Sequence, residues 1–157
     1  MKYLQHLRTI TLHRWYVMIE CFKRGLYWQG LIHDLSKYSP TELAVAKYYQ
    51  DNRTPIGEDK RQNGFSVAWL HHKGRNPHHW EYWIDWVEGE QLLCPIPERY
   101  LIEMACDVIG ASKAYNGRAY KPVMPLEYFY ANRATWIMRQ EDKDKLEIIL
   151  AENARMA

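Results

Sequence analysis

The stretch LIHDLSK, residues 31–37, places a histidine and an aspartate side by side inside an apolar run. A carboxylate that is buried without a cation or hydrogen-bond donors suffers a large desolvation penalty. A divalent metal ion would offset that penalty, because imidazole and carboxylate groups are both ligands of first-row metals. His33-Asp34 is therefore the centre of a candidate metal site, and its remaining ligands must come from other parts of the chain.

The rest of the sequence predicts an all-α fold, with residues 1–157 forming one compact helical bundle. Apolar residues recur at three- and four-residue steps, which is the period of a helix. A chain of 157 residues is long enough for one substantial hydrophobic core. The expected helices cover 3–25, a short segment that carries His33-Asp34 and ends near Tyr38, and then about 42–49, 65–73, 77–87, 98–115, 126–139 and 143–154.

Three segments are expected to connect these helices. Residues 51–64 are polar and contain Pro55, Gly57 and Gly64, which predicts an exposed loop. Residues 89–97 and 120–125 also contain proline or glycine and are expected to be connectors.

The composition excludes several classes of partner. The net charge is only +2 with 25% charged residues, which gives no strong nucleic-acid-binding signal. No stretch approaches the length of a membrane span, so no membrane association is expected. Three cysteines without a CxxC pair suit free thiols in a reducing compartment, and the expected location is the cytoplasm. The composition leaves a homo-oligomer open.

Helical phase selects further candidate ligands. In the first expected helix, the apolar stripe that contains Leu4 and Trp15 lies nearly opposite His13, at about 100° per residue. Other apolar residues flank His13, so this helix is expected to be buried on both sides and His13 can face an internal polar site. Asp107 lies at the edge of the apolar stripe of the expected helix 98–115.

The histidines between positions 71 and 79 divide into two pairs by the same reasoning. His72 shares an apolar helical face with Trp69, whereas His71 points elsewhere. In the helix that Asn-Pro is expected to start, His79 borders the tryptophan face and His78 projects away. The complete candidate metal-ligand set is His13, His33, Asp34, His72, His79 and Asp107.

Each candidate also has an ordinary explanation when it is taken alone. A helical histidine can be a hydrogen-bonded core residue, and an aspartate can stabilise a helix start. The histidine tract could bind metal adventitiously, and Asp107 could pair with Lys113. One site explains all of these residues together, whereas the ordinary account needs a separate explanation for each. Four glutamates are expected to be solvated or to contact ligands rather than the metal: Glu20, Glu42, Glu81 and Glu103.

The chain order of the candidates resembles that of the HD superfamily, which comprises helical metal-dependent phosphohydrolases. In that superfamily the site consists of a first histidine, an adjacent His-Asp pair and a distant aspartate, which correspond to His13, His33-Asp34 and Asp107. Some members add two histidines that hold a second metal, and His72 and His79 occupy that place in the order. The resemblance covers about residues 4–116, the metal-site core, and leaves the C-terminal helices 126–154 outside it.

Two shorter motifs extend the resemblance. LIHDLSK is similar to the His-Asp-hydrophobic-Gly-Lys element of some HD enzymes, with Ser36 where glycine is usual, and the resemblance implies that Lys37 meets the substrate phosphate. The chain also resembles a family of small HD-like proteins that share an Asn-Pro-His-His-like element and a late Glu-Met-x-x-Asp. Here these are residues 76–79 and 103–107.

The resemblance implies a hydrolase that acts on a small phosphorylated substrate, with a nucleotide as the leading candidate. One or two divalent transition metals, from among Mn, Fe, Co, Ni and Zn, would polarise the phosphoryl group and lower the pKa of a bound water towards about 7. Asp34 would bridge the metals, and Asp34 and Lys37 are the expected catalytic residues. Lys37 and Arg75 are the expected substrate-binding residues, although Arg75 could also be an ordinary surface charge.

Two other functions fit the same residues. The ligand order also resembles that of HD-fold di-iron oxygenases, which use O2 to cleave carbon bonds. A non-catalytic HD-like protein that acts by binding a partner is the third alternative.

Overall fold

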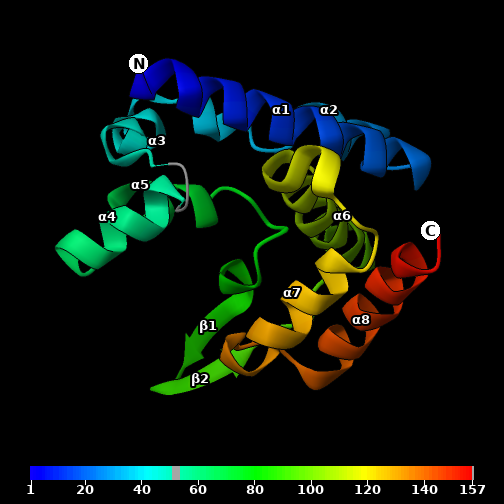
Figure 1. Cartoon of the computed structure of the whole chain (residues 1–157). Helices are drawn as coiled ribbons and strands as arrows, with labels where there is room; N and C mark the ends of the chain where they lie inside the picture. The colour runs from blue at the N-terminus through cyan, green and yellow to red at the C-terminus, as the bar shows by residue number, and fades with distance from the viewer. Residues whose placement is uncertain (51–53, 157) are drawn as a thin grey trace.

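The computed structural model describes residues 1–50 and 54–156. The predicted all-α fold is confirmed, because helices form most of the described chain and its strands are confined to one two-stranded hairpin (Figure 1). The α-helices are α1 Lys2–Lys23, α2 Tyr27–Ile32, α3 Pro40–Leu43, α4 Pro55–Asn63, α5 Val67–Lys73, α6 Glu98–Asn116, α7 Met124–Asn132 and α8 Gln140–Ala154. Short 3-10 helices cover Leu35–Tyr38, Ala44–Tyr48, Trp80–Trp83, Gly117–Ala119 and Arg133–Thr135.

Helices α1 and α6 lie against each other and form the frame of the site (Figure 1). A Cβ atom added at Gly110 of α6 would lie 2.4 Å from Val17 Cγ2 and 2.9 Å from the Val17 backbone nitrogen. Glycine at position 110 therefore permits the close approach of the two helices. Because His13 and Asp107 lie one turn earlier on their respective helices, this contact brings them to the same level.

α1 buries one face, and it is the face opposite the predicted apolar stripe. His13 is 6% exposed and Val17 is fully buried, whereas Leu4 is 73% and Trp15 is 56% exposed. The expectation that α1 is buried on both sides is therefore wrong, although His13 does face the interior. Periodicity identifies the faces of a helix, but it does not tell which face a neighbouring helix covers.

The main hydrophobic core lies on the other side of α6, where α7 and α8 pack against it. A smaller apolar cluster of Val17, Cys21 and Cys106 lies between α1 and α6. All three cysteines are free thiols. The buried residues of the main core are Ile96, Leu101, Met104, Ala105, Ile109, Phe129, Met138, Leu146 and Leu150.

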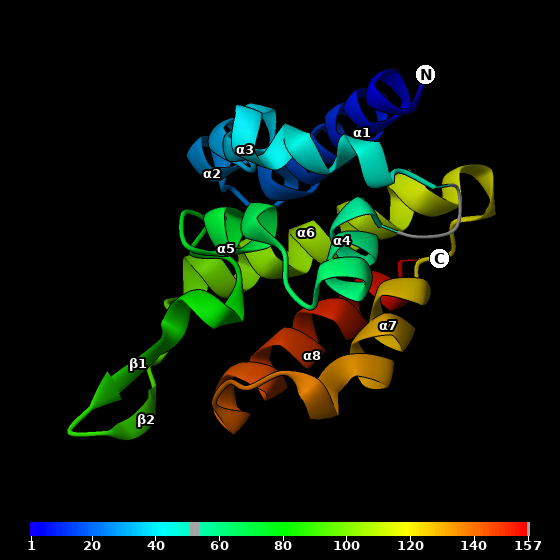
Figure 2. The same cartoon turned by 90° about the vertical axis from the view of Figure 1, so that its left-hand side faces the viewer.

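The predicted helix 77–87 does not form. After the 3-10 helix Trp80–Trp83, strands β1 Ile84–Val87 and β2 Glu90–Leu93 pair as an antiparallel hairpin, in register from Ile84↔Leu93 to Val87↔Glu90. The two loop residues, Glu88 and Gly89, have φ values of 52° and 86°, as the tight turns that match strand twist require. The hairpin projects away from the helices (Figure 2).

The predicted loop 51–64 is also wrong where the structure describes it, because Pro55–Asn63 form α4. Thr54 Oγ1 accepts a hydrogen bond from the Gly57 backbone N–H at 3.1 Å, and Pro55 occupies the first turn. Gly64 ends the helix with φ 80°. Proline and glycine here mark the two ends of a short helix rather than a loop. Residues 51–53 lie outside the described part.

Two further helices are shorter than predicted. The expected helix 42–49 is α3 followed by the 3-10 helix Ala44–Tyr48, and the expected helix 126–139 is α7 followed by Arg133–Thr135. The last helix, α8, begins three residues earlier than expected. Within the described residues, no helix combines the length and apolar character needed to cross a bilayer.

Candidate metal centre

His33 and Asp34 lie at a break between two helices. The sequence predicts instead that both residues lie within one short helix. α2 ends at Ile32, and Asp34 has φ 53° and ψ 24°, in the left-handed region that is uncommon for residues other than glycine. Arg14 supports this break, because its guanidinium donates to the carbonyl oxygens of His33 at 2.7 Å and Leu31 at 3.0 Å. Since consecutive helical side chains point about 100° apart, the break explains how both side chains of the pair face one buried centre.

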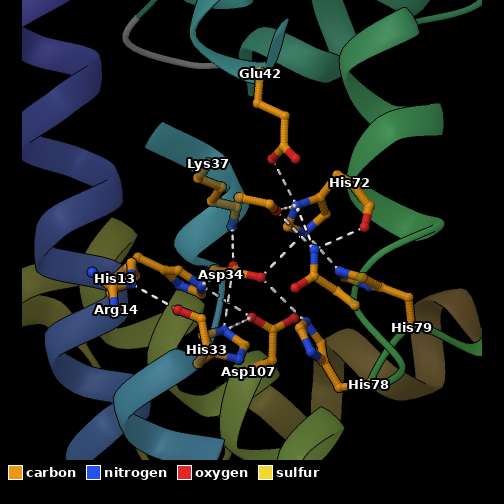
Figure 3. A network of polar contacts seen from close by, with 12 residues as sticks. His13, Arg14, His33, Asp34, Lys37, Glu42, His72, His78, His79 and Asp107 are labelled. Carbon is orange, nitrogen blue, oxygen red and sulfur yellow. Dashed lines mark hydrogen bonds and ion pairs between the residues drawn. The ribbon is translucent and has the colours of Figure 1, made fainter. Parts of the chain in front are cut away.

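The first half of this centre joins α1, the His-Asp break and α6 (Figure 3). His13 Nε2 lies 3.3 Å from Asp34 Oδ2 and 3.0 Å from Asp107 Oδ1. His33 Nε2 lies 3.3 Å from each of the same two oxygens. Two imidazoles and two carboxylates thus converge on one point, with one donor atom of each within 4.8 Å of the others.

The second half uses the other oxygen of Asp34 (Figure 3). Asp34 Oδ1 lies 3.3 Å from His72 Nε2 and 3.4 Å from His78 Nε2. His79 Nε2 lies 2.8 Å from His72 Nε2. The second half therefore consists of three imidazoles and one carboxylate, and Asp34 is common to both halves.

The donor atoms at this centre are close together but poorly aligned for hydrogen bonds. His13 Nε2, His33 Nε2, His78 Nε2 and both carboxylate oxygens of Asp34 are buried and have no hydrogen-bond partner among the described residues. A buried polar atom without a partner is costly. Nitrogen and oxygen lone pairs that converge on a shared point, instead of on each other, fit a divalent metal ion.

Two glutamates contact the histidine Nδ1 atoms, which face away from Asp34. His33 Nδ1 lies 3.0 Å from Glu103 Oε1 and His72 Nδ1 lies 2.8 Å from Glu42 Oε2. His78 Nδ1 also lies 3.2 Å from Glu103 Oε1. Metal-binding histidines in proteins usually donate their second ring N–H to such a partner, which directs the other nitrogen at the metal. Glu42 and Glu103 therefore lie against the ring nitrogens that face away from Asp34, and Glu103 also forms with His33 and His78 a third group whose donor atoms lie within 4.8 Å of one another.

A family model described as a family of unknown function, DUF5662, matches residues 2–152. The chain belongs to this family. The match to the DUF5662 model includes α7 and most of α8 as well as the metal centre, so the family unit extends beyond the 4–116 region of the HD resemblance. No curated protein and no solved structure matches the chain significantly.

Burial and the attraction between opposite charges shift the pKa values of His33 and Asp34 in opposite directions. Burial raises the pKa of Asp34, but His33 and Lys37 hold that pKa well below its usual range. Burial lowers the pKa of His33, but Asp34 and Asp107 hold it well above its usual value. For His79, burial and the neighbouring histidines together hold the pKa well below its usual value. The carboxylates therefore favour the charged form of His33, whereas burial and the neighbouring histidines favour the neutral form of His79.

All six predicted candidates lie at the centre, and a seventh candidate, the fifth histidine, joins them. His78 was predicted to project away, but it is 1% exposed and faces Asp34. Helical phase does not apply to His78, because residues 76–79 form a turn, closed by a 3.1 Å hydrogen bond from the His79 N–H to the Asn76 carbonyl. The Asn-Pro dipeptide is itself a turn signal, and it was the available clue.

The two predicted substrate-binding residues, Lys37 and Arg75, lie in different places relative to the centre. Lys37 Nζ forms an ion pair with Asp34 Oδ2, and its side chain is 21% exposed. Arg75 is exposed and its guanidinium donates to the His71 carbonyl oxygen at 3.4 Å. The structure therefore brings Lys37 to the centre but does not bring Arg75 there.

A cavity of about 910 Å³ opens beside the centre and is lined by residues of both halves, including His13, Asp107 and His72. Lys37 is the only lysine or arginine among its described lining residues, which also include the acidic side chains of Glu81 and Glu127. The cavity thus has room for a ligand beside the candidate metal-binding residues. Its aromatic lining residues are Trp69, Trp80, Tyr115, Tyr128 and Trp136.

Proposed function

We propose that the protein is an HD-type metal-dependent phosphohydrolase that removes phosphate from a small phosphorylated substrate, with a nucleotide as the leading candidate. The observation that carries the proposal is the set of misaligned, buried donor atoms around both oxygens of Asp34. The order of His13, His33-Asp34 and Asp107 in the chain supports assignment to the HD superfamily. A bound divalent transition metal would polarise a phosphoryl oxygen and make hydroxide available near neutral pH.

The chain's own residues supply two sets of ligands for such metals. The first half offers two carboxylates and two imidazoles, and the second offers three imidazoles and the shared Asp34. Mixed nitrogen and oxygen donors suit several first-row metals, including Mn, Fe, Co, Ni and Zn. Asp34 has the central role in this proposal, because one carboxylate oxygen faces each half.

Lys37 is the residue that we assign to the substrate phosphate. Burial lowers the pKa of its ammonium, but the carboxylates of Asp34 and Asp107 have the larger effect and raise that pKa above its usual value. Lys37 therefore stays charged. The ammonium lies beside Asp34 and on the cavity wall. It can donate a charge-assisted hydrogen bond to an anion held at the centre.

The charge of the cavity favours a substrate with one phosphate group. Glu81 and Glu127 lie on its wall, and Lys37 is the only lysine or arginine among the described lining residues. The additional charges of a triphosphate would lack partners, whereas the aromatic walls can pack against an uncharged ring. A volume of about 910 Å³ also exceeds what a bare phosphate needs and lies within the range of ligand pockets.

The proposal is tested by phosphate release from a matched panel. Metal-free protein is reconstituted with Mn²⁺ or Co²⁺ and given nucleoside mono-, di- and triphosphates of each base, together with a simple sugar phosphate. We expect release from at least one monophosphate and none from the Asp34→Asn variant. Metal-loaded protein that releases phosphate from no member of the panel would contradict the proposal.

The ligand set also favours one alternative, the HD-fold di-iron oxygenase. Five imidazoles and two carboxylates surround the centre, and such donors suit iron. Oxygen consumption by iron-loaded protein with candidate organic substrates, without phosphate release, would support this alternative. A protein that keeps its cellular function after loss of Asp34 would instead support the non-catalytic binding role.

A further inference from the structure

We infer that Glu103 is a positioning residue shared by both halves of the centre, whereas Glu42 positions the second half alone. The inference rests on the proposed metal centre and concerns how its ligands are held. It assigns a role to the glutamate of the Glu-Met-x-x-Asp motif, which binds neither substrate nor metal in the proposed mechanism.

One oxygen of Glu103 serves a ligand from each half. Oε1 lies 3.0 Å from His33 Nδ1, in the first half, and 3.2 Å from His78 Nδ1, in the second. The two imidazole rings lie against each other, with centroids 4.4 Å apart. Because the Nδ1 of each ring lies against the same carboxylate oxygen, Nε2 is the nitrogen of each ring that faces the centre.

The position of Glu103 on α6 accounts for this double contact. Glu103 precedes Asp107 by four residues, so both side chains lie on the same helical face. Its side chain is 6% exposed.

Glu42 makes a similar pair of contacts with a different consequence. Its Oε2 lies 2.8 Å from His72 Nδ1, and its Oε1 lies 2.7 Å from His71 Nδ1. His72 belongs to the second half, whereas His71 belongs to neither. Loss of the Glu42 charge should therefore weaken one half only.

The test measures metal binding directly and needs no substrate. Metal-free wild-type protein and the variants Glu103→Gln and Glu42→Gln are titrated with Mn²⁺ or Co²⁺ by calorimetry. Loss of an outer partner typically costs 10–100-fold in metal affinity. We expect Glu103→Gln to weaken both binding steps by about this factor and Glu42→Gln to weaken only one. Glu98→Gln, which removes an exposed charge from the same helix, should leave both steps unchanged.

Glu103→Asp provides a second variant if the glutamine substitution impairs folding. It keeps the charge but retracts the carboxylate, so it should also weaken both steps. Weakening of a single step by either Glu103 variant, with two metals bound by the wild type, would overturn the inference while leaving the metal centre intact. A wild-type protein that binds no metal would overturn both the inference and the proposed function.

Discussion

Helices α1 and α6 enclose two buried charged clusters that differ in how their polar atoms are satisfied. At the level of His13 and Asp107 lies the candidate metal centre. About two turns further along both helices, the buried carboxylate of Glu20 lies 2.7 Å from Lys113 Nζ. The Glu20 carboxylate also lies 2.8 Å from Lys23 Nζ and accepts a hydrogen bond from the Arg24 guanidinium at 3.0 Å.

The difference shows that buried charge alone does not identify a functional site. Both Glu20 oxygens accept hydrogen bonds from cations, so that cluster is complete without a ligand. Burial raises the Glu20 pKa, but these hydrogen bonds lower it to about 2. Asp34, in contrast, has one cation partner among the described residues, Lys37, and four imidazole nitrogens lie 3.3–3.4 Å from its two oxygens without forming hydrogen bonds to them. The imidazole nitrogens that converge on Asp34 without hydrogen bonds to it are the feature that indicates metal binding.

Asp34→Asn should have the largest effect, because it removes the charge shared by both halves while keeping the shape of the side chain. We expect loss of both metals and a fall in phosphate release of more than about 100-fold, beyond the loss typical of an outer partner. Metal analysis and kinetics on the same preparation check this. If the variant kept two metals per chain, the contrast with the Glu20 cluster would be lost.

Glu20→Gln should affect stability instead of metal content. The Glu20 pKa is lowered from 4.5 to about 2, so its contribution is complete above about pH 4.5 and is lost as the pH falls towards 2. The shift corresponds to about 3 kcal/mol of unfolding free energy at pH 7. Urea unfolding of metal-free protein should show this loss, and a flatter dependence on pH between 4.5 and 2. Equal stability of the variant and wild type across that window would contradict the prediction.

His78→Ala and His71→Ala separate a ligand from an outer contact. His78 Nε2 faces Asp34, whereas His71 contacts Glu42. We expect His78→Ala to weaken one metal-binding step by more than about 100-fold, and His71→Ala to weaken it by less than about 10-fold. Titration of both variants with the same metal provides the comparison. Equal losses would mean that His78 is not a ligand.

Lys37→Met should affect turnover alone, because it changes substrate contact and leaves the candidate ligands in place. Methionine keeps most of the lysine stem and removes the charge. Loss of a charge-assisted hydrogen bond of about 1.5–3 kcal/mol predicts a fall in kcat/KM of about 10-fold or more. Metal content and melting temperature should stay near those of the wild type. Unchanged kinetics would remove Lys37 from the site.

The sequence was sufficient to predict the helical class from periodicity, which is a local property. The six candidates were selected by residue chemistry and chain order as well as by helical phase, and they lie together although His33, Asp34 and His79 are not on the expected helices. The buried face of α1 was not predictable in this way. It depends on the close approach of α6 at Gly110, which is a tertiary contact. Trp15 and Val17 both belong to apolar faces of the helix in the sequence, yet Trp15 is exposed and Val17 is buried, because α6 covers only the face that contains Val17.

The errors at α4 and at His78 share another cause. Proline and glycine mark helix ends as well as loops, so the same signals predict a loop around Pro55 and a helix start at Pro77. A two-residue Glu-Gly turn between short apolar runs was the clue to the hairpin. Once residues 76–79 form a turn, helical phase no longer determines the direction of His78.

Anomalous X-ray diffraction from crystals grown with Mn²⁺ tests the central claim most directly. The account predicts two peaks on opposite sides of the Asp34 carboxylate, about 3.5–4 Å apart as in known two-metal sites. One peak should contact His13, His33 and Asp107, and the other should contact His72, His78 and His79. The absence of any peak within coordination distance of Asp34 would contradict the account.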